Sequence, residues 1–577
     1  MEVRKGYFFM KSYLKFYLVI ILLSLVATRQ LFLPGYFPMH DDLQVGRLYQ
    51  MDKCIRGFQL PCRWAPDMGY GYGYPLFNFY PPFPYYLGEV FHLLGFSFIN
   101  SVKLLFIVGF VLSGVFVFLL GKEFWGDLGG LASAIFYIFA PYHAVDVYVR
   151  GAMGEFWAIV FFPVIFWAIA KALKNRQKRY IAFLALFYGL LLLSHNIMSM
   201  IFSPLMVAWA LFLVWYYHKP LRTLVPVVIG GIWGLGLAGF FTLPAFFEKK
   251  YVHVETMLMG YFNYLAHFVP IKKLFLERFW GYGSSGWGQT SGMPFQIGYL
   301  HWGIPAVALI LFTFLLLKRK IRLDYFLLFT FYFLLSLGAA FMAHIRSTPI
   351  WQTIKPLEYL QFPWRFLALV IFGFSFASGG VIFGVARLVE KKMSRPVCKL
   401  LTAGLIAAVV ILNFSYFKPE KVLPIIDEEK LFSPKGWNKL QTDAIFDYLP
   451  IYAQQPPAAP APEEPEVLEG KVGITYLKRG TNWYQFHAKV IGDLAQLRLP
   501  IYDFPGWKVW VDKKSVPIDY DNFLGLITFK IPKGDHHISA RLTNTPIRTV
   551  SNLISFFSWL VFAFVLVQSI EQRYFQA

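Results

Sequence analysis

Charged residues are scarce in this chain. Only 15% of its 577 residues are Asp, Glu, Lys or Arg, whereas 57% are hydrophobic. A soluble protein of this length carries about a quarter of its residues as charged side chains. The composition therefore excludes an ordinary soluble protein.

Several sequence motifs of well-known chemistry are also missing. The chain has no Walker phosphate-binding loop, no GxSxG sequence and no paired CxxC sequence, which leaves a nucleotide-driven pump or a serine hydrolase without support. The formal net charge is +21, yet no basic run lies in a nucleic-acid-binding module. We expect no nucleic-acid partner.

Long apolar runs are what the chain has in abundance. About 20 apolar residues cross a bilayer core of ~30 Å as a helix, and we expect the first run to be such a span because no small-residue cleavage site follows it. Hydropathy predicts about twelve spans, near 16–34, 100–120, 128–142, 155–173, 180–194, 197–217, 221–245, 299–317, 324–342, 365–387, 399–416 and 550–570.

Lysine and arginine in alternate connections predict the orientation. Basic residues cluster before the first span and in the segments 171–179, 318–322 and 387–395. Positive residues favour the cytoplasmic side, so we expect a multi-pass protein of the cytoplasmic membrane with a cytoplasmic N-terminus. The exterior connections are then 35–99, 246–298, 343–364 and 417–549.

Two of the three cysteines, Cys54 and Cys62, fall in the first exterior connection. In an oxidising exterior they would close a small disulfide loop. The spacing alone agrees equally well with two free thiols.

The segment after the eleventh predicted span has a different pattern. Residues 453–466, AQQPPAAPAPEEPE, predict an extended, disordered linker. Short alternating runs follow, separated by Gly492-Asp493, Pro505-Gly506 and Lys533-Gly534, and they predict a small antiparallel β-sandwich. The expected organisation is a membrane domain (1–416) whose first exterior loop (35–99) carries the active site, a connector (417–466), a sandwich (467–548), and a final helix with a short tail (549–577).

Ionisable and polar residues gather at the outer ends of the predicted spans. At membrane depth such groups are costly and favour a functional interpretation. A bundle would bring the following residues around one cavity: His40, Asp41, Asp42, Arg150, Glu155, His195, Asn196, Glu358 and Arg365.

Each of these residues also has a structural interpretation. Asp41 or Asp42 would cap a helix starting at Leu43. Arg150 and Glu155 would form an ion pair, His195 with Asn196 would make a contact between helices, and Arg365 would extend to the interface. The sequence leaves both the structural and the functional interpretation open.

Glycosyl transfer is the chemistry that such a set suits best. A carboxylate takes the proton of an acceptor hydroxyl, which attacks an anomeric carbon through an oxocarbenium-like state. Cationic groups or a metal stabilise the departing phosphate. His40, Asp41 and Asp42 are candidate ligands for a divalent cation, Mg²⁺ or Mn²⁺.

Five motifs together resemble a known family: HDD after the first span, RWAPDMGYGYGYPLFNFYPPFPYYLG, VYVRGAMGEFWA, LSHN and QFPWRF. They are similar to microbial membrane proteins called 6-pyruvoyl-tetrahydropterin synthase-related, and YDFPGWKVWVD resembles the carboxy-terminal part of YfhO-like proteins. Both groups resemble the C-type glycosyltransferases (GT-C). That resemblance implies a multispan bundle, a polyprenyl-phosphate-sugar donor and Asp41 as the catalytic base. Many relatives carry a His a few residues later, where this chain has Gln44, Val45 and Gly46.

The function predicted from the sequence is an inverting transfer of a sugar from a polyprenyl-phosphate donor to an acceptor on the exterior face. Asp41 and Asp42 are the catalytic candidates, and the other polar residues bind the donor phosphate or substrate. The acceptor is a glycan, lipid or protein of the cell envelope, and membrane lipids surround the bundle. The alternatives are a transporter or flippase of lipid-linked glycans and a non-catalytic glycan-binding scaffold. A transporter usually has internal repeats and charges at mid-bilayer, and this chain shows neither pattern.

Overall fold

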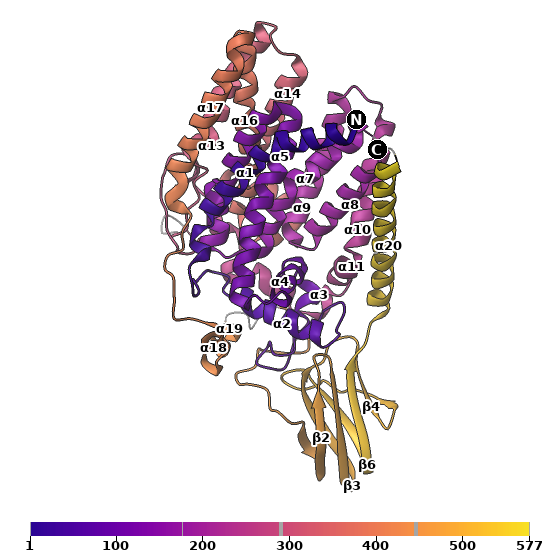
Figure 1. Ribbon diagram of the computed structural model, residues 1–577. Helices are drawn as coiled ribbons and strands as arrows, with labels where there is room; N and C mark the ends of the chain where they lie inside the picture. The colour runs from indigo at the N-terminus through magenta and orange to yellow at the C-terminus, as the bar shows by residue number, and fades with distance from the viewer. Residues whose placement is uncertain (1, 176, 288–291, 443–447, 576–577) are drawn as a thin grey trace.

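The computed structural model describes the chain apart from residues 1, 176, 288–291, 443–447 and 576–577. Helices form most of the molecule, and an antiparallel β-sheet projects from one end of the bundle (Figure 1). The two termini lie at the opposite end. A helical membrane protein with a small all-β unit near the C-terminus is therefore confirmed.

Within the described residues, eight helices are long and apolar enough to cross a membrane, or nine if one bent pair counts as a span. The predicted count of twelve is not confirmed. The bundle helices are α1 (Glu2–Ala27), α5 (Phe98–Ile138), α7 (Met153–Asn175), α8 (Lys178–Leu192), α9 (Asn196–Tyr216), α10 (Val225–Leu237), α11 (Gly239–Phe247), α13 (Tyr299–Leu317), α14 (Leu323–Met342), α16 (Leu367–Leu388), α17 (Lys391–Asn413) and α20 (Pro546–Phe575).

Local geometry explains most of the difference in count. Helix α5 covers two predicted spans because its chain reverses at Gly126, where φ is +76°, so that Gly121 lies against Gly130. Helix α8 has 15 residues, fewer than the ~20 that a perpendicular span needs. Helices α10 and α11 make one predicted span but meet at a bend of 74°.

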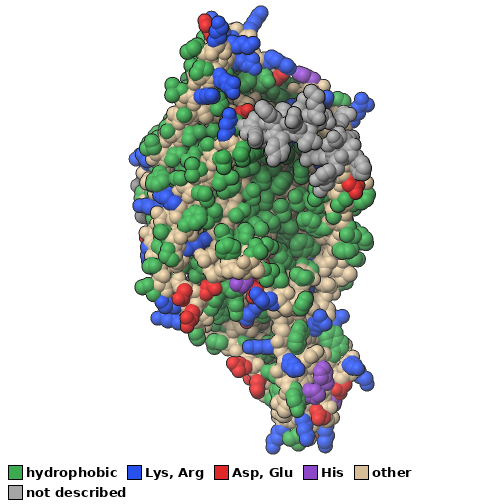
Figure 2. Space-filling model, in the orientation of Figure 1, with side chains coloured by type: hydrophobic (Ala, Val, Ile, Leu, Met, Phe, Trp, Pro, Cys, Tyr) green, Lys and Arg blue, Asp and Glu red, His purple; other side chains and the backbone are tan. Residues whose placement is uncertain are grey.

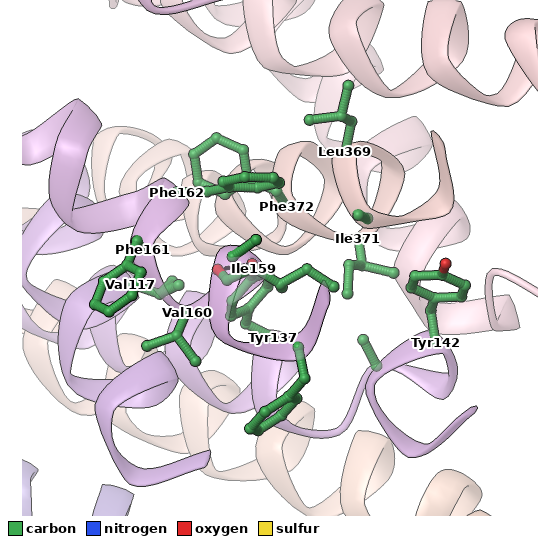
Figure 3. Packing of buried hydrophobic residues seen from close by; sticks show 14 of the residues in the cluster. Val117, Tyr137, Tyr142, Ile159, Val160, Phe161, Phe162, Leu369, Ile371 and Phe372 are labelled. Atoms are coloured by element: carbon green, nitrogen blue, oxygen red, sulfur yellow. Dashed lines mark hydrogen bonds between the residues drawn. The ribbon is translucent and has the colours of Figure 1, made fainter. Parts of the chain in front are cut away.

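The centre of the bundle is formed by α5, α7 and α16. Figure 3 shows Phe162 of α7 facing Phe372 of α16, with ring centroids 6.3 Å apart. Tyr137 of α5 donates a hydrogen bond of 2.8 Å to the carbonyl of Ile159. This bond satisfies a buried hydroxyl in the low-dielectric interior and ties α5 to α7.

The sheet contains β1 (Glu466–Glu469), β2 (Val472–Arg479), β3 (Trp483–Tyr502), β4 (Trp507–Val511), β5 (Lys514–Val516) and β6 (Leu526–Leu542). Its strand order is β1-β3-β6-β4-β5, and β2 also pairs with β3. The strands form one hydrogen-bonded sheet rather than the two of a sandwich, because β3 and β6 run through its whole length. The predicted turns at Gly492-Asp493 and Lys533-Gly534 lie inside these strands, where the register shifts between Val490 and Leu494. Pro505-Gly506 does separate two strands, β3 and β4.

The first connection joins the bundle to the sheet through α2 (Gln44–Arg56), α3 (Leu76–Phe79) and α4 (Phe83–Leu93). Its aromatic segment packs on the sheet: Trp64 lies 5.5 Å from Trp507, and Tyr72 lies 5.7 Å from Tyr502, between ring centroids. Trp507 is a buried core residue. The sheet is therefore docked on the first connection and is not held only by the final helix.

The remaining predictions about the connections have mixed outcomes. Cys54 and Cys62 form a disulfide. Residues 453–465 contain no helix or strand, yet Ala461 N donates a 2.7 Å hydrogen bond to Tyr70 O, so the segment is attached to the first connection rather than disordered.

Lys and Arg side chains gather at the end of the molecule that carries the termini (Figure 2). One residue of the basic segment 171–179, Arg176, lies outside the described residues. The direction in which each end faces across the membrane stays a prediction.

Candidate active site

A cavity of about 430 Å³ lies between the first connection and the ends of α7, α9 and α16. Eight of the nine polar residues predicted from the sequence line it: His40, Asp41, Asp42, Arg150, Glu155, His195, Asn196 and Arg365. Segments far apart in the chain thus contribute to one space, as their shared position at span ends predicts.

Glu358 is the exception, and its predicted place in the site is wrong. It does not line the cavity, and its carboxylate pairs instead with the exposed Lys355 at 3.2 Å. Between Glu358 and Arg365, Gln361 has a left-handed backbone conformation with a φ of +62°. Gln361 and Arg365 line the cavity, whereas Glu358 does not.

Asp41 is fixed by both its backbone and its side chain. Its N–H donates to Arg150 O at 2.9 Å, and the N–H of His40 donates to Val149 O at 3.0 Å. The carboxylate accepts hydrogen bonds from Arg47 Nη1 at 2.8 and 2.9 Å and from Gln44 Nε2 at 2.9 Å. Arg47 is only 4% exposed, whereas Asp41 is 31% exposed, so the carboxylate reaches the cavity and the guanidinium lies behind it.

Arg47 and Gln44 are site residues that the sequence does not reveal. Both belong to α2 and are three residues apart, which places them on one face of the helix toward Asp41. An arginine within a predicted exterior loop carries no signal of its own. Its pairing is visible only in the folded chain.

Asp42 bonds to neighbouring residues of the first connection. Asp42 Oδ1 accepts hydrogen bonds from the Tyr36 hydroxyl and, at 3.3 Å, from Met39 N. Burial raises the pKa of Asp42, and the Tyr36 bond opposes that rise. Helix α2 begins at Gln44 and no side chain caps it, so neither aspartate is its N-cap.

His40, Asp41 and Asp42 do not converge on a common point. His40 Nε2 lies 2.9 Å from Tyr282 O, while each aspartate binds its own partners. Burial lowers the pKa of His40. Within the described part of the chain, no group of three or more His, Cys, Asp or Glu residues is arranged to hold a metal ion. The predicted His-Asp-Asp ligand set does not fit a metal in this arrangement.

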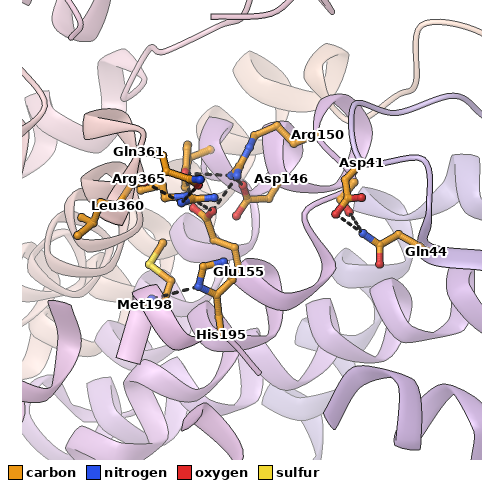
Figure 4. Close-up of polar contacts among 12 residues, drawn as sticks. Asp41, Gln44, Asp146, Arg150, Glu155, His195, Met198, Leu360, Gln361 and Arg365 are labelled. Carbon is orange, nitrogen blue, oxygen red and sulfur yellow. Dashed lines mark hydrogen bonds and ion pairs between the residues drawn. The ribbon is translucent and has the colours of Figure 1, made fainter. Parts of the chain in front are cut away.

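A buried ionic network forms the opposite part of the lining (Figure 4). Glu155 Oε2 accepts hydrogen bonds from Arg150 Nη2 at 2.8 Å and from Arg365 Nε at 3.2 Å. Its other oxygen accepts a bond of 2.5 Å from the Tyr142 hydroxyl. Arg150 and Glu155 do form an ion pair, and Arg365 joins it rather than extending to an interface.

Two further partners hold the Arg150 guanidinium. Asp146 lies in the π-helical turn Val145–Val149 and pairs with Arg150 Nη1 at 2.5 Å, and the guanidinium carbon stacks 4.4 Å above the Trp364 ring. Asp146 is not among the site residues predicted from the sequence, although its i,i+4 spacing to Arg150 is a signal for such a pair. Both terminal nitrogens of Arg150 thus bond to carboxylates, and its main role is to hold this part of the cavity lining in place.

Two hydrogen-bond donors remain available at the cavity. Arg365 Nη2 forms no hydrogen bond with the described residues, since Nε and Nη1 make all the bonds of its guanidinium. His195 Nδ1 accepts a hydrogen bond from Met198 N at 3.1 Å, which places the imidazole hydrogen on Nε2. Burial and, next, Arg365 lower the pKa of His195 to about 3. The ring is thus a neutral donor at physiological pH.

Asn196 has a structural contact as well as a place on the lining. Its Nδ2 donates to Phe79 O at 3.2 Å, which ties the start of α9 to α3. Aromatic side chains complete the cavity: Tyr80, Tyr261, Phe262, Phe362, Trp364 and Tyr448. Polar donors, the partly exposed carboxylate of Asp41 and aromatic surfaces therefore line one cavity.

Residues 77–417 match the family described as "6-pyruvoyl-tetrahydropterin synthase related domain; membrane protein". An uncharacterized protein of Lactococcus lactis subsp. cremoris (strain MG1363) is 23% identical over 341 residues, which are 56% of this chain and 53% of the relative. The match thus spans about half the length of that curated relative.

Two solved structures are partly similar. An oligosaccharyltransferase from Archaeoglobus fulgidus aligns with 77% of this chain and 61% of its own at 12% identity and a TM-score of 0.42. An arabinofuranosyltransferase from Mycobacteria aligns with 72% of this chain and 28% of its own at 14% identity and a TM-score of 0.42.

Proposed function

The chain belongs to the 6-pyruvoyl-tetrahydropterin synthase-related family of membrane proteins, and we propose that it is a membrane glycosyltransferase. The observation that carries this proposal is one cavity lined both by a partly exposed carboxylate and by donors that have no hydrogen-bond partner among the described residues. Asp41 supplies the carboxylate, and Arg365 with His195 supplies the donors. Pterin chemistry finds no support in the residues of this site.

The donor substrate is a polyprenyl-phosphate sugar. Arg365 Nη2 and His195 Nε2 would bind its phosphate, and a charge-assisted bond from an arginine is the stronger of the two. Glu155 keeps Arg365 in place through Nε, so that Nη2 stays directed to the substrate. A cavity of about 430 Å³ has the size of a small-molecule site.

Asp41 acts as the general base. Its carboxylate takes the proton of an acceptor hydroxyl as that oxygen forms a bond to the anomeric carbon. The bond between the anomeric carbon and the phosphate oxygen breaks at the same time, and the electron pair leaves with the lipid phosphate. Arg365 and His195 stabilise the charge of that leaving group.

Other residues position these groups. Arg47 and Gln44 hold the Asp41 carboxylate in one orientation through three short hydrogen bonds. Arg150 carries the backbone carbonyl that binds Asp41 N and shares Glu155 with Arg365. Because His40, Asp41 and Asp42 do not converge, these steps use the side chains alone.

The test is a transfer assay with purified protein. Incubation with a panel of polyprenyl-phosphate sugars and membrane-derived acceptors should release polyprenyl phosphate and label the acceptor. Movement of a lipid-linked sugar across a vesicle without release of polyprenyl phosphate would replace the enzyme by a transporter. If the protein binds the donor but neither releases polyprenyl phosphate nor moves the lipid-linked sugar, the result would indicate a glycan-binding scaffold.

A further inference from the structure

A second cavity lies where the β-sheet meets the helical bundle. Its volume is about 480 Å³, and it shares no lining residue with the candidate active site. Residues 58–61, the end of β6 and the start of α20 surround it. Three arginines contribute to its lining: Arg63, Arg541 and Arg548.

The two inner arginines, Arg63 and Arg548, are almost fully buried, at 5% and 1% exposure. Arg63 donates from Nη1 to Asn78 Oδ1 at 3.0 Å, and from Nη2 to Phe240 O at 2.9 Å and Asn552 Oδ1 at 2.8 Å. All of these acceptors are neutral. No carboxylate of the described residues bonds to the Arg63 guanidinium.

Glu248 is the carboxylate that compensates Arg548, which donates to it from Nε at 2.9 Å. Glu248 also accepts hydrogen bonds from Asn78 Nδ2 at 2.9 Å and from Thr545 Oγ1 at 2.6 Å, so its capacity is shared among three donors. Three guanidinium groups therefore lie around this cavity. Among the described residues, Glu248 is the one carboxylate that bonds to any of them. Burial, and next the neighbouring Arg548, lower the pKa of Arg63 to about 10.

Two donor atoms of the inner arginines are unsatisfied. Arg63 Nε and Arg548 Nη1 are buried and have no hydrogen-bond partner among the described residues. A buried donor without a partner costs free energy, and an unpaired charge costs more. Asn482, Asn544 and Trp510 add neutral donors at the same cavity.

The cavity also borders the expected membrane surface. Arg548 lies in the first turn of α20, a helix long and apolar enough to cross a membrane. On the other side, Phe58 and Leu60 are exposed apolar residues, at 89% and 66% exposure. Exposed apolar side chains beside a basic pocket suit a site that takes a head group while the acyl chains stay in the bilayer.

We propose that this junction cavity binds a phosphate group, with Arg63, Arg541 and Arg548 as its ligands. The phosphate belongs to a membrane phospholipid or to a soluble phosphate ester, and both present the same anionic oxygens to the three guanidinium groups. Bound there, the anion links the first connection, the sheet and the final helix. This site does not depend on the glycosyl transfer proposed above.

The test measures binding by native mass spectrometry of the full chain in detergent. One arm adds phosphatidylglycerol, with zwitterionic phosphatidylcholine for comparison, and the second adds inorganic phosphate. Arg541→Gln removes an exposed ligand, and Asn544→Trp fills the cavity from its rim. Lys489→Gln, an exposed lysine on β3 that does not line the cavity, is the charge-matched control.

We expect Arg541→Gln to weaken phosphatidylglycerol binding about tenfold, the effect of one lost charge-assisted hydrogen bond. Asn544→Trp should weaken it at least as much, because the indole ring takes space in the cavity that the phosphate would occupy. Lys489→Gln should bind as the unchanged protein does. Arg63→Gln should weaken binding further, and if that variant does not fold, the two rim variants decide. If inorganic phosphate binds and the same variants weaken its binding, a soluble phosphate ester is the source. If phosphatidylglycerol binds and inorganic phosphate does not, the source is the lipid.

Two results would overturn the proposal. One is equal affinity of the unchanged protein, Arg541→Gln and Asn544→Trp for both probes. The other is an equal loss in Lys489→Gln, because attraction would then follow net charge rather than the cavity.

Discussion

Replacing Asp41 by Asn tests the proposed base and the ion pair that holds it. The change removes the proton acceptor while keeping the shape of the side chain. General bases supply a factor of roughly 10² to 10⁴ in rate, so we expect transfer to fall by about that factor. Donor binding should persist, because Arg365 and His195 lie on a different part of the lining.

The same change affects stability by an amount that the contacts set. Arg47 is 4% exposed and donates to both Asp41 oxygens, so Asp41→Asn leaves a buried guanidinium without its counter-charge. The loss of a hydrogen bond to a charged group costs about 1.5–3 kcal/mol. A lowered unfolding midpoint should therefore accompany the lost activity.

A double variant separates the two effects. Asp41→Asn combined with Arg47→Gln removes both charges of the buried pair, so much of the lost stability should return. Transfer should remain low, because no carboxylate is restored. The assay is release of polyprenyl phosphate at saturating donor, with thermal unfolding followed on the same samples.

Asp42→Asn is the matched control for Asp41→Asn. It keeps an oxygen that accepts from the Tyr36 hydroxyl and Met39 N, so the loss in rate should be much smaller. Normal turnover in Asp41→Asn, or recovery of turnover in the double variant with Arg47→Gln, would refute Asp41 as the base. Loss of transfer in Asp42→Asn alone would exchange the two roles.

Three further predictions concern the donor site, pH and topology. Arg365→Ala should weaken binding of the donor lipid by about 1.5–3 kcal/mol, and Arg150→Ala should lower stability more than donor affinity; equal donor affinity in Arg365→Ala would return this residue to a structural role. Burial lowers the pKa of His195 from 6.5 to about 3 in the folded chain. Below pH 6.5 the unfolded state therefore binds a proton that the folded state does not, and the free energy of unfolding falls as the pH falls toward 3. His195→Asn should show a weaker fall in its unfolding curves, and the same pH dependence as the unchanged protein would contradict a buried neutral ring. Protease added to intact cells should cleave within 453–466, and cleavage only after permeabilisation would reverse the orientation.

Much of the site can be predicted because its residues lie at the ends of apolar runs. Asp41 follows the first run and Arg365 precedes a later one, so both are expected at the same depth of the membrane and therefore around one cavity. Arg47 could not be found this way, because it lies within an amphipathic helix of the connection. Glu358 was assigned wrongly because the left-handed backbone of Gln361 cannot be read from its side chain.

The fold was predictable in class but not in its reversals. Apolar composition indicates helices across a membrane, and alternation indicates strands. The reversal of α5 at Gly126 depends on close contact between Gly121 and Gly130, which only the packed chain shows. In the sheet, the turn-like dipeptides Gly492-Asp493 and Lys533-Gly534 lie within long strands. Strands β3 and β6 pair with each other on both sides of the register shift between Val490 and Leu494.

The segment that carries Asp41 is anchored at two points along the backbone. Tyr36 pairs with Leu423 through hydrogen bonds of 3.1 and 2.6 Å, and Asp41 N binds Arg150 O. Only four residues, 37 to 40, join these two hydrogen-bonded positions, so an insertion or deletion between them would displace one of the two positions. Loss or gain of one residue from 37 to 40 would shift the register and turn the carboxylate away from Arg47. Length variation in this family should therefore be absent from this segment and be found on either side of it, a pattern that aligned relatives can test without any assay.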